Sequence, residues 1–151
     1  MLNIEPLLQT KGRILSVDFG DVRTGLAVSD ETRFLASGIG YISVGGIVKT
    51  AEEVARIAAQ NEVSAIVVGL PVNMNGSEGP RAARAREFAD LLRERISVPV
   101  CMVDERMTTM EASQYLNMTD TRGKKRKQVI DTLSAQIILQ NTLDALRMRS
   151  K

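Results

Sequence analysis

The chain has 151 residues, of which 44% are hydrophobic and 25% are charged, a composition typical of one globular domain. Its 20 Lys and Arg against 18 Asp and Glu give a formal net charge of +2, which permits nucleic-acid binding without requiring it. The chain has no His and one Cys, which excludes His-dependent catalysis, His-ligated metals, zinc–cysteine clusters and an internal disulfide. An enzyme of this composition has to work with carboxylates, hydroxyls, Lys and Arg.

The first third of the chain predicts three short strands, over 13–19, 24–29 and 34–44. Short turns join them, so we expect an antiparallel meander. The first twelve residues look like an N-terminal extension of a single domain that spans 1–151. They lack the basic-then-apolar order of a signal peptide, and no apolar run is long enough to cross a bilayer, so we expect a cytoplasmic protein without a membrane anchor.

Helices and strands alternate in the remainder of the chain. Hydrophobic spacing predicts helices over 47–61, 77–95, 108–116 and 129–147, and strands over 63–70 and 98–103. Ser77 is the expected N-cap of the second of these helices. Strands separated by helices pair in parallel through crossovers. We therefore predict an α/β fold with a mixed five-stranded sheet, three antiparallel strands followed by two parallel ones, and helices on both faces.

Three carboxylates stand where this topology would bring them to one edge of the sheet. Asp18 ends the first strand, and Glu105 follows the last one. Asp131 lies early in the last helix, with the small residues Ser134 and Ala135 on the same helical face, which favours close approach to the sheet. Each acid alone has a simpler explanation: turn amides bind Asp18, a surface arginine pairs with Glu105, and the helix dipole favours Asp131.

Together the three acids indicate a metal site. Three converging carboxylates without a neighbouring Lys or His repel one another, and Mg²⁺ or Mn²⁺ relieves that repulsion. Two such ions, about 4 Å apart, suit phosphodiester hydrolysis, because one activates water and the other stabilises the leaving oxygen. This chemistry requires no His, in agreement with the composition.

Candidate substrate-binding residues surround these acids. Donors in the polar loop 72–79 could hold a phosphate, one arginine follows the first turn, and another directly follows Glu105. A basic block over 122–127 precedes the helix that carries Asp131 and is typical of a phosphate contact. The simpler alternatives are a solvated loop with a helix cap, ordinary salt bridges and a flexible basic loop. The candidates are Arg23, Asn73, Asn75, Ser77, Arg106, Lys124, Lys125, Arg126 and Lys127.

Four segments in order, 16–30, 67–79, 103–109 and 125–140, resemble the motifs of the YqgF-type proteins, bacterial pre-16S rRNA nucleases formerly described as Holliday junction resolvases. The resemblance implies an RNase H-like fold, with Asp18, Glu105 and Asp131 as metal-binding catalytic acids. Met107, where Leu is usual, and the N-terminal dozen residues depart from the pattern, and neither involves the acids.

The resemblance also implies the substrate. It predicts a metal-dependent nuclease that processes the 5′ end of precursor 16S rRNA in ribosome biogenesis, on free structured RNA or within a ribosomal particle. Two alternatives stay open: a resolvase of four-way DNA junctions, which would need a symmetric dimer to cut two strands, and a non-catalytic nucleic-acid-binding factor. Both a monomer and a homodimer are compatible with the sequence.

Overall fold

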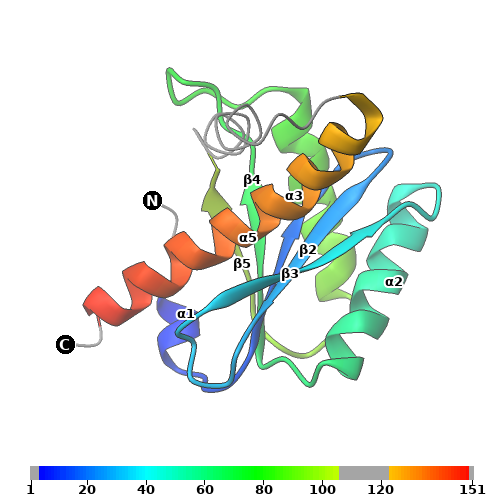
Figure 1. Ribbon diagram of the computed structural model, residues 1–151. Helices are drawn as coiled ribbons and strands as arrows, with labels where there is room; N and C mark the ends of the chain where they lie inside the picture. Colours follow the sequence, from blue (N-terminus) through cyan, green and yellow to red (C-terminus); the bar gives the residue numbers. More distant parts are fainter. Residues whose placement is uncertain (1–3, 106–122, 150–151) are drawn as a thin grey trace.

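A computed structural model describes residues 4–105 and 123–149, with the side chains of the last helix described from Thr132 onward. Figure 1 shows its central sheet with helices on either side. The strands are β1 (Ile14–Asp18), β2 (Thr24–Ser29), β3 (Ala36–Ile42), β4 (Ala65–Leu70) and β5 (Val100–Asp104). The helices are α1 (Glu5–Leu8), α2 (Ile47–Gln60), α3 (Pro80–Arg93) and α5 (Gly123–Arg149).

The sheet has the predicted mixed topology. Its strand order is β3-β2-β1-β4-β5, with β1–β2 and β2–β3 antiparallel and β1–β4 and β4–β5 parallel. The continuous burial of β4 explains its run of apolar residues, because a central strand covered on both faces has no solvent-facing side. In this strand order β1 is the central strand, and β4 separates it from β5.

Helices cover both faces of the sheet. Helices α2 and α3 bury their apolar stripes against one face, and α1 and α5 cover the other. Side chains alternate along β1, so Leu15 and Val17 face α2 and α3 while Ile14 faces the α5 layer. Cys101 is buried in the α5 layer as a small core residue.

Several element boundaries differ from those predicted. Strand β3 is shorter than the predicted 34–44, and α3 starts at Pro80 instead of Ser77, with Gly79 as its N-cap. Proline is favoured at the first helical position because its fixed φ suits a helix. The amide N–H that it lacks would have no hydrogen-bond partner within the helix at that position. Helix α5 starts at Gly123, six residues before the predicted start, so the basic block is mainly helical instead of a loop. The helix predicted over 108–116 lies outside the described residues.

Helix α5 approaches the sheet closely, as its small residues predicted. The hydroxyl of Ser16 on β1 donates a buried hydrogen bond to the carbonyl of Ala135, at 2.9 Å. On β3, a Cβ at Gly38 would stand 2.7 Å from Thr132 Cγ2, closer than real contacts allow. The backbone of β3 can therefore pass under α5 only because residue 38 is glycine, and the long helix lies directly across β1, β2 and β3.

The N-terminal segment is packed against the domain. Ile4 and Leu7 are fully buried in the α5 layer. The guanidinium of Arg33 donates to the carbonyls of Leu7 and Gly12, at 2.6 and 2.7 Å, and so ties this segment to the β2–β3 hairpin. The residues preceding β1 thus complete one part of the hydrophobic core.

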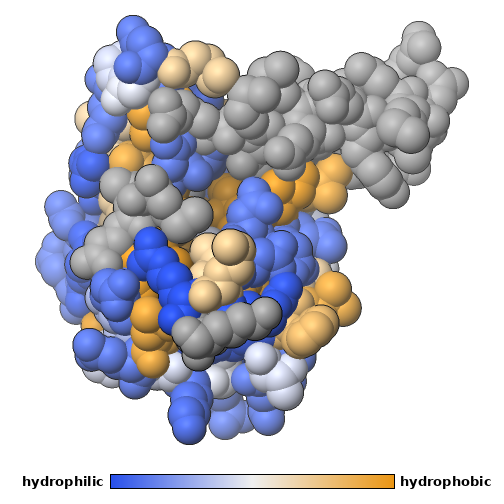
Figure 2. Space-filling view, turned by 90° about the vertical axis from the view of Figure 1, so that its left-hand side faces the viewer, coloured by the Kyte–Doolittle hydropathy of each residue, from blue (hydrophilic) through white to orange (hydrophobic). Residues whose placement is uncertain are grey.

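Figure 2 shows one side of the molecular surface. Hydrophilic residues predominate there, and the hydrophobic ones form separate smaller areas. Within residues 4–105 and 123–149, no helix combines the length and apolarity needed to span a bilayer.

Candidate active site at the carboxyl edge of the sheet

Strand alternation brings three backbone positions to one place under α5. In the register of the sheet, Asp18 ends β1, Gly69 lies near the end of β4, and Glu105 directly follows β5. Val67 and Val103, two residues before Gly69 and Glu105, face the α5 layer, as does Ser16 before Asp18. Because side chains repeat their direction every second residue, Asp18 and Glu105 point to the α5 face at the carboxyl edge of the parallel strands.

The side chains of Asp18 and Glu105 meet in a hydrogen bond. Two carboxylates this close repel each other when both are ionised, and a proton or a metal ion between them relieves that repulsion. Burial raises the pKa of the Glu105 carboxyl above its ordinary value; the Asp18 hydrogen bond and the positive charge of Arg81 lower it, and the charge of Asp104 raises it further. The pair therefore has a strong electrostatic preference for a shared cation, whether proton or metal.

Gly69 forms the floor beneath Glu105. A Cβ at residue 69 would overlap the Glu105 carboxylate and would stand 2.8 Å from Ile138 Cδ1 of α5. The Glu105 backbone is held as well, since its amide donates to the carbonyl of Leu70 at 3.2 Å. The absence of a side chain on the strand between β1 and β5 is thus what allows the two carboxyl groups to meet across it.

The turn after β1 is anchored on the opposite face of the sheet. Phe19 stacks on Phe88 of α3, with ring centroids 4.7 Å apart. The amide of Gly20 is hydrogen-bonded to the hydroxyl of Thr24, at 3.4 Å, across the turn. Since Phe19 is fixed in the α2–α3 layer, the preceding residue, Asp18, is held on the other side.

The remaining predicted acid and the basic block are only partly described. Asp131 and Lys124–Lys127 lie on α5, but their side chains fall outside the described residues, as does Arg106 altogether. Among the described side chains, to which that of Asp131 does not belong, no group of three His, Cys, Asp or Glu could hold a metal ion. Arg23 is half-buried in the turn between β1 and β2, at the same edge as Asp18.

The predicted phosphate-binding residues of loop 72–79 bind one another. Asn73 Nδ2 donates to Ser77 Oγ at 2.9 Å, and Asn75 Oδ1 accepts from the Ser77 amide and hydroxyl at 3.0 and 2.7 Å. Ser77 is therefore a loop-closing residue and does not cap α3. An isolated bridge between Val72 and Glu78 closes the loop into a small exposed hairpin at the carboxyl edge.

Arg81 is a site-adjacent residue that the sequence analysis did not single out. It lies in the first turn of α3 and lines a hollow of about 230 Å³ with Pro71, Val72, Asn73, Gly79 and Pro80. Its charge acts on the Glu105 carboxyl. The one available sequence signal was a cation in a helix first turn, where the helix dipole disfavours positive charge.

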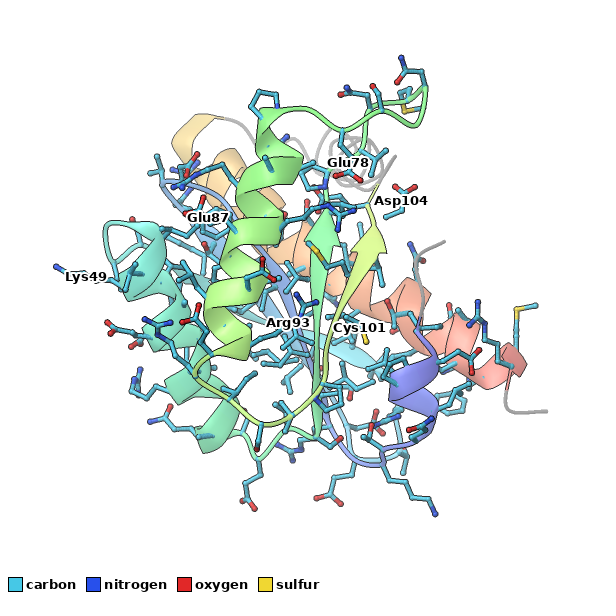
Figure 3. All side chains as sticks on the ribbon, turned by 180° about the vertical axis from the view of Figure 1, so that it is seen from behind. Lys49, Glu78, Glu87, Arg93, Cys101 and Asp104 are labelled. Atoms are coloured by element: carbon cyan, nitrogen blue, oxygen red, sulfur yellow. The ribbon has the colours of Figure 1, made fainter. Side chains whose placement is uncertain are left out.

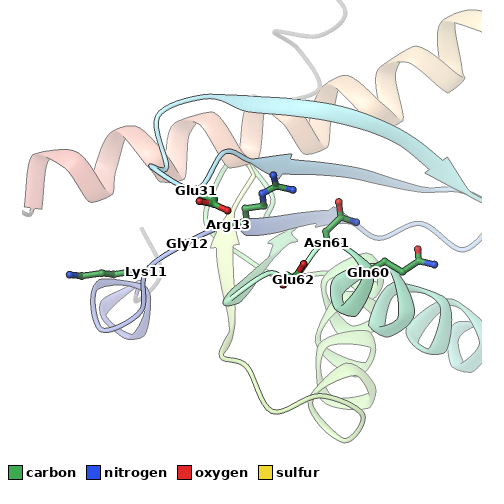
Figure 4. A pocket seen from close by; sticks show the side chains of 7 residues that line it. All are labelled: Lys11, Gly12, Arg13, Glu31, Gln60, Asn61 and Glu62. Atoms are coloured by element: carbon green, nitrogen blue, oxygen red, sulfur yellow. The ribbon is translucent and has the colours of Figure 1, made fainter.

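In Figure 3, which shows the molecule from behind, Asp104 at the end of β5 and Glu78 are labelled at this edge, and Cys101 and Arg93 lie farther from it. A larger hollow, of about 450 Å³, lies at the other end of the sheet, where Lys11, Arg13, Glu31 and Glu62 contribute charges of both signs (Figure 4). Ligands of α/β sheets bind beyond the carboxyl ends of the strands, and two glutamates would oppose a polyanion. The carboxyl edge is therefore the better candidate for a nucleic-acid site.

Comparison with solved structures gives the fold. The chain is similar to Thermus thermophilus RuvC in complex with a Holliday junction substrate, with a TM-score of 0.59, 15% identity, and coverage of 91% of this chain and 96% of that one. It is also similar to a manganese-soaked nuclease domain of the human cytomegalovirus terminase, with a TM-score of 0.55, 13% identity, and coverage of 89% and 87%. The fold is the RNase H-like fold of the RuvC-type nucleases.

Comparison with known sequences gives the family. A protein of Pelotomaculum thermopropionicum, provisionally named a pre-16S rRNA nuclease, is 46% identical over 88% of this chain and 87% of its own length. A Geobacillus protein with the same name is 45% identical over 88% of this chain and 98% of its own. Residues 12–145 match the family described as RuvX, Holliday junction resolvase. With its strand order, its paired acids and this match over most of its length, the chain belongs to the RuvX (YqgF) family of nucleases.

Proposed function

We propose that the protein is a metal-dependent nuclease that hydrolyses phosphodiester bonds at the carboxyl edge of its sheet, with Asp18, Glu105 and Asp131 as its metal-binding catalytic acids. The observation that carries the proposal is the hydrogen-bonded pair of Asp18 and Glu105 over Gly69. Two carboxyl groups in contact cost a structural core stability through their mutual repulsion, whereas a cation site requires them.

The donor set fits Mg²⁺ or Mn²⁺. Both ions prefer oxygen ligands, and carboxylates are the oxygen donors this chain has without His. Positions 131, 135 and 138 lie on one face of a helix, and Ala135 and Ile138 both contact the sheet beside Asp18 and Gly69. Asp131, one turn before Ala135, is in register to supply the third carboxylate. When bound, two such ions would supply an activated water and charge stabilisation at the leaving oxygen.

The substrate we propose is structured RNA, and specifically the 5′ end of precursor 16S rRNA. The support is the name of the relatives, which are 40–46% identical and carry a pre-16S rRNA nuclease name. Arg23, Arg106 and the lysines of α5 would contact phosphates, and the loop that contains Asn73, Asn75 and Ser77 would border the strand as a closed hairpin.

A resolvase of four-way DNA junctions is the second candidate function. The family description and the RuvC complex, which holds a Holliday junction, favour it. Resolution cuts two strands and so requires two sites related by symmetry. A dimer that cleaves junctions symmetrically would support this candidate, and a monomer active on RNA would exclude it.

The direct test offers both substrates to the same purified protein. We expect cleavage of a precursor 16S rRNA fragment with Mg²⁺ or Mn²⁺, no cleavage with a chelator, and a strong preference for this RNA over a four-way DNA junction, measured by gel at equal concentrations. Cleavage confined to the junction would replace the RNA assignment with the resolvase. No metal-dependent cleavage of either substrate would leave the non-catalytic binding factor.

The lysines at the start of α5 provide a separate prediction for substrate binding. Changing Lys124, Lys125 and Lys127 to Ala should weaken RNA binding about tenfold or more and reduce the slope of log affinity against log salt by about two, because each phosphate contact releases about 0.7–0.9 counterions. Filter binding over a salt series measures both. An unchanged affinity with an unchanged slope would contradict a substrate contact by the basic block.

A further inference from the structure

Arg81 differs from the other described arginines of α3 in having no carboxylate partner. Arg84 pairs with Asp21 and Glu87, Arg86 with Glu78, and Arg93 with Asp90. Arg81 is exposed and makes no ion pair among the described residues, although its charge reaches the Glu105 carboxyl. Its positive charge is thus available to a ligand at the carboxyl edge.

The position of Arg81 is not one that stabilises the helix. It directly follows Pro80, the first residue of α3, and no acidic residue occupies that first turn. The amino end of a helix carries partial positive charge, so a cation there costs stability unless an anion lies against it. A residue that is unfavourable for its own helix and makes no ion pair with the described side chains points to an external anion.

The hollow lined by Arg81 has the size for part of a nucleotide. Its volume of about 230 Å³ lies below the 300–1,000 Å³ typical of sites for whole drug-sized ligands, so a phosphate with some of its sugar is the fitting occupant. Pro71 and Val72 form its wall next to Leu70, whose carbonyl accepts the Glu105 amide. The hollow therefore adjoins the paired acids along the strand end.

We propose that Arg81 and this hollow bind a backbone phosphate of the nucleic-acid substrate, next to the phosphodiester at Asp18 and Glu105. The inference rests on the proposed nuclease function and adds a substrate-positioning residue to it. Arginine suits the role because its planar guanidinium donates two parallel hydrogen bonds to a phosphate, which fixes direction as well as register.

The test is binding and cleavage by Arg81→Ala and Arg81→Lys, with Arg95→Ala as the matched control. Arg95 follows the far end of α3 and donates to the carbonyl of Leu91, so its loss removes the same charge away from the site. We expect Arg81→Ala to bind a single-stranded RNA about three- to tenfold more weakly, with the salt slope reduced by about one. Arg81→Lys should restore the slope but only part of the affinity, and Arg95→Ala should change neither.

A neutral-linkage scan distinguishes a defined phosphate contact from a general charge effect. Binding is measured in an Asp18→Asn background, so that nothing is cleaved, with oligonucleotides that carry one methylphosphonate at successive positions. One linkage next to the cut should weaken binding to the chain with Arg81 and have no effect once Arg81 is Ala. Equal effects in both backgrounds at every position, or unchanged binding by Arg81→Ala, would overturn the proposal.

The two proposals fail in different ways. If the unaltered protein cleaves RNA and Arg81→Ala binds and cleaves identically, the nuclease stands and the role of Arg81 is wrong. If the unaltered protein cleaves neither RNA nor a junction, the nuclease is wrong, while the methylphosphonate scan still decides whether Arg81 holds a phosphate.

Discussion

Replacing Asp18 by Asn should abolish metal-dependent cleavage while leaving the protein folded. Asn has the shape of Asp, but it loses the negative charge that a divalent cation requires, so we expect kcat to fall about a thousandfold, the effect of about 4 kcal/mol on the barrier. Folding should not suffer, because the Asn amide can donate a hydrogen bond to the Glu105 carboxylate and one of the two neighbouring acids is removed. Single-turnover cleavage of the precursor RNA measures the loss.

Metal binding by itself gives a readout independent of activity. A ligand that binds the native state at 100 times its Kd stabilises it by about 2.7 kcal/mol, or about 5–10 °C in Tm for a domain of this size. Titration with Mn²⁺ should therefore raise the Tm of the unaltered protein and should raise that of Asp18→Asn much less. A folded Asp18→Asn protein that still cleaves, or that gains the same Tm on adding Mn²⁺, would remove Asp18 from the mechanism.

Gly69→Ala should inactivate the protein through a residue that contacts no substrate. The added methyl group would occupy the space of the Glu105 carboxylate and press on Ile138. Overpacking of this kind costs about 1–3 kcal/mol of stability, and displacement of Glu105 by even 1 Å from its metal position should lower kcat about a hundredfold. Thermal unfolding and single-turnover cleavage measure the two effects separately.

Two further variants separate the packing effect from the effect on Glu105. Gly79→Ala is the control for stability, because a Cβ there meets only Asn73 Nδ2 at 3.9 Å, and it should unfold at the temperature of the unaltered protein. Adding Ile138→Val to Gly69→Ala removes the Cδ1 atom and should recover stability without recovering cleavage, since Glu105 is still displaced. If Gly69→Ala were fully active, the gap above Gly69 would not be needed for catalysis. The same would follow if the double variant recovered both its stability and its cleavage activity.

The order of the strands could be predicted because it follows from local pattern and chain geometry. Short turns after β1 and β2 leave only antiparallel pairing, and the apolar run of β4 demands cover on both faces. Boundaries were less predictable, because they depend on competing local choices. Ser77 has the chemistry of an N-cap, yet its hydroxyl is bound to Asn75 in the loop, and Pro80 starts the helix instead.

The sequence by itself determined the sheet, its helical cover and the kinds of side chain at the strand ends, because periodicity and turn chemistry act between near neighbours. Only the tertiary structure decided that Asp18 and Glu105 share a hydrogen bond, that Gly69 makes room for it, and that the charge of Arg81 reaches Glu105. These features join residues up to 87 positions apart, between 18 and 105 in the chain. Whether residues so far apart in the chain meet in space depends on the register of β1, β4 and β5. A short stretch of sequence does not determine that register.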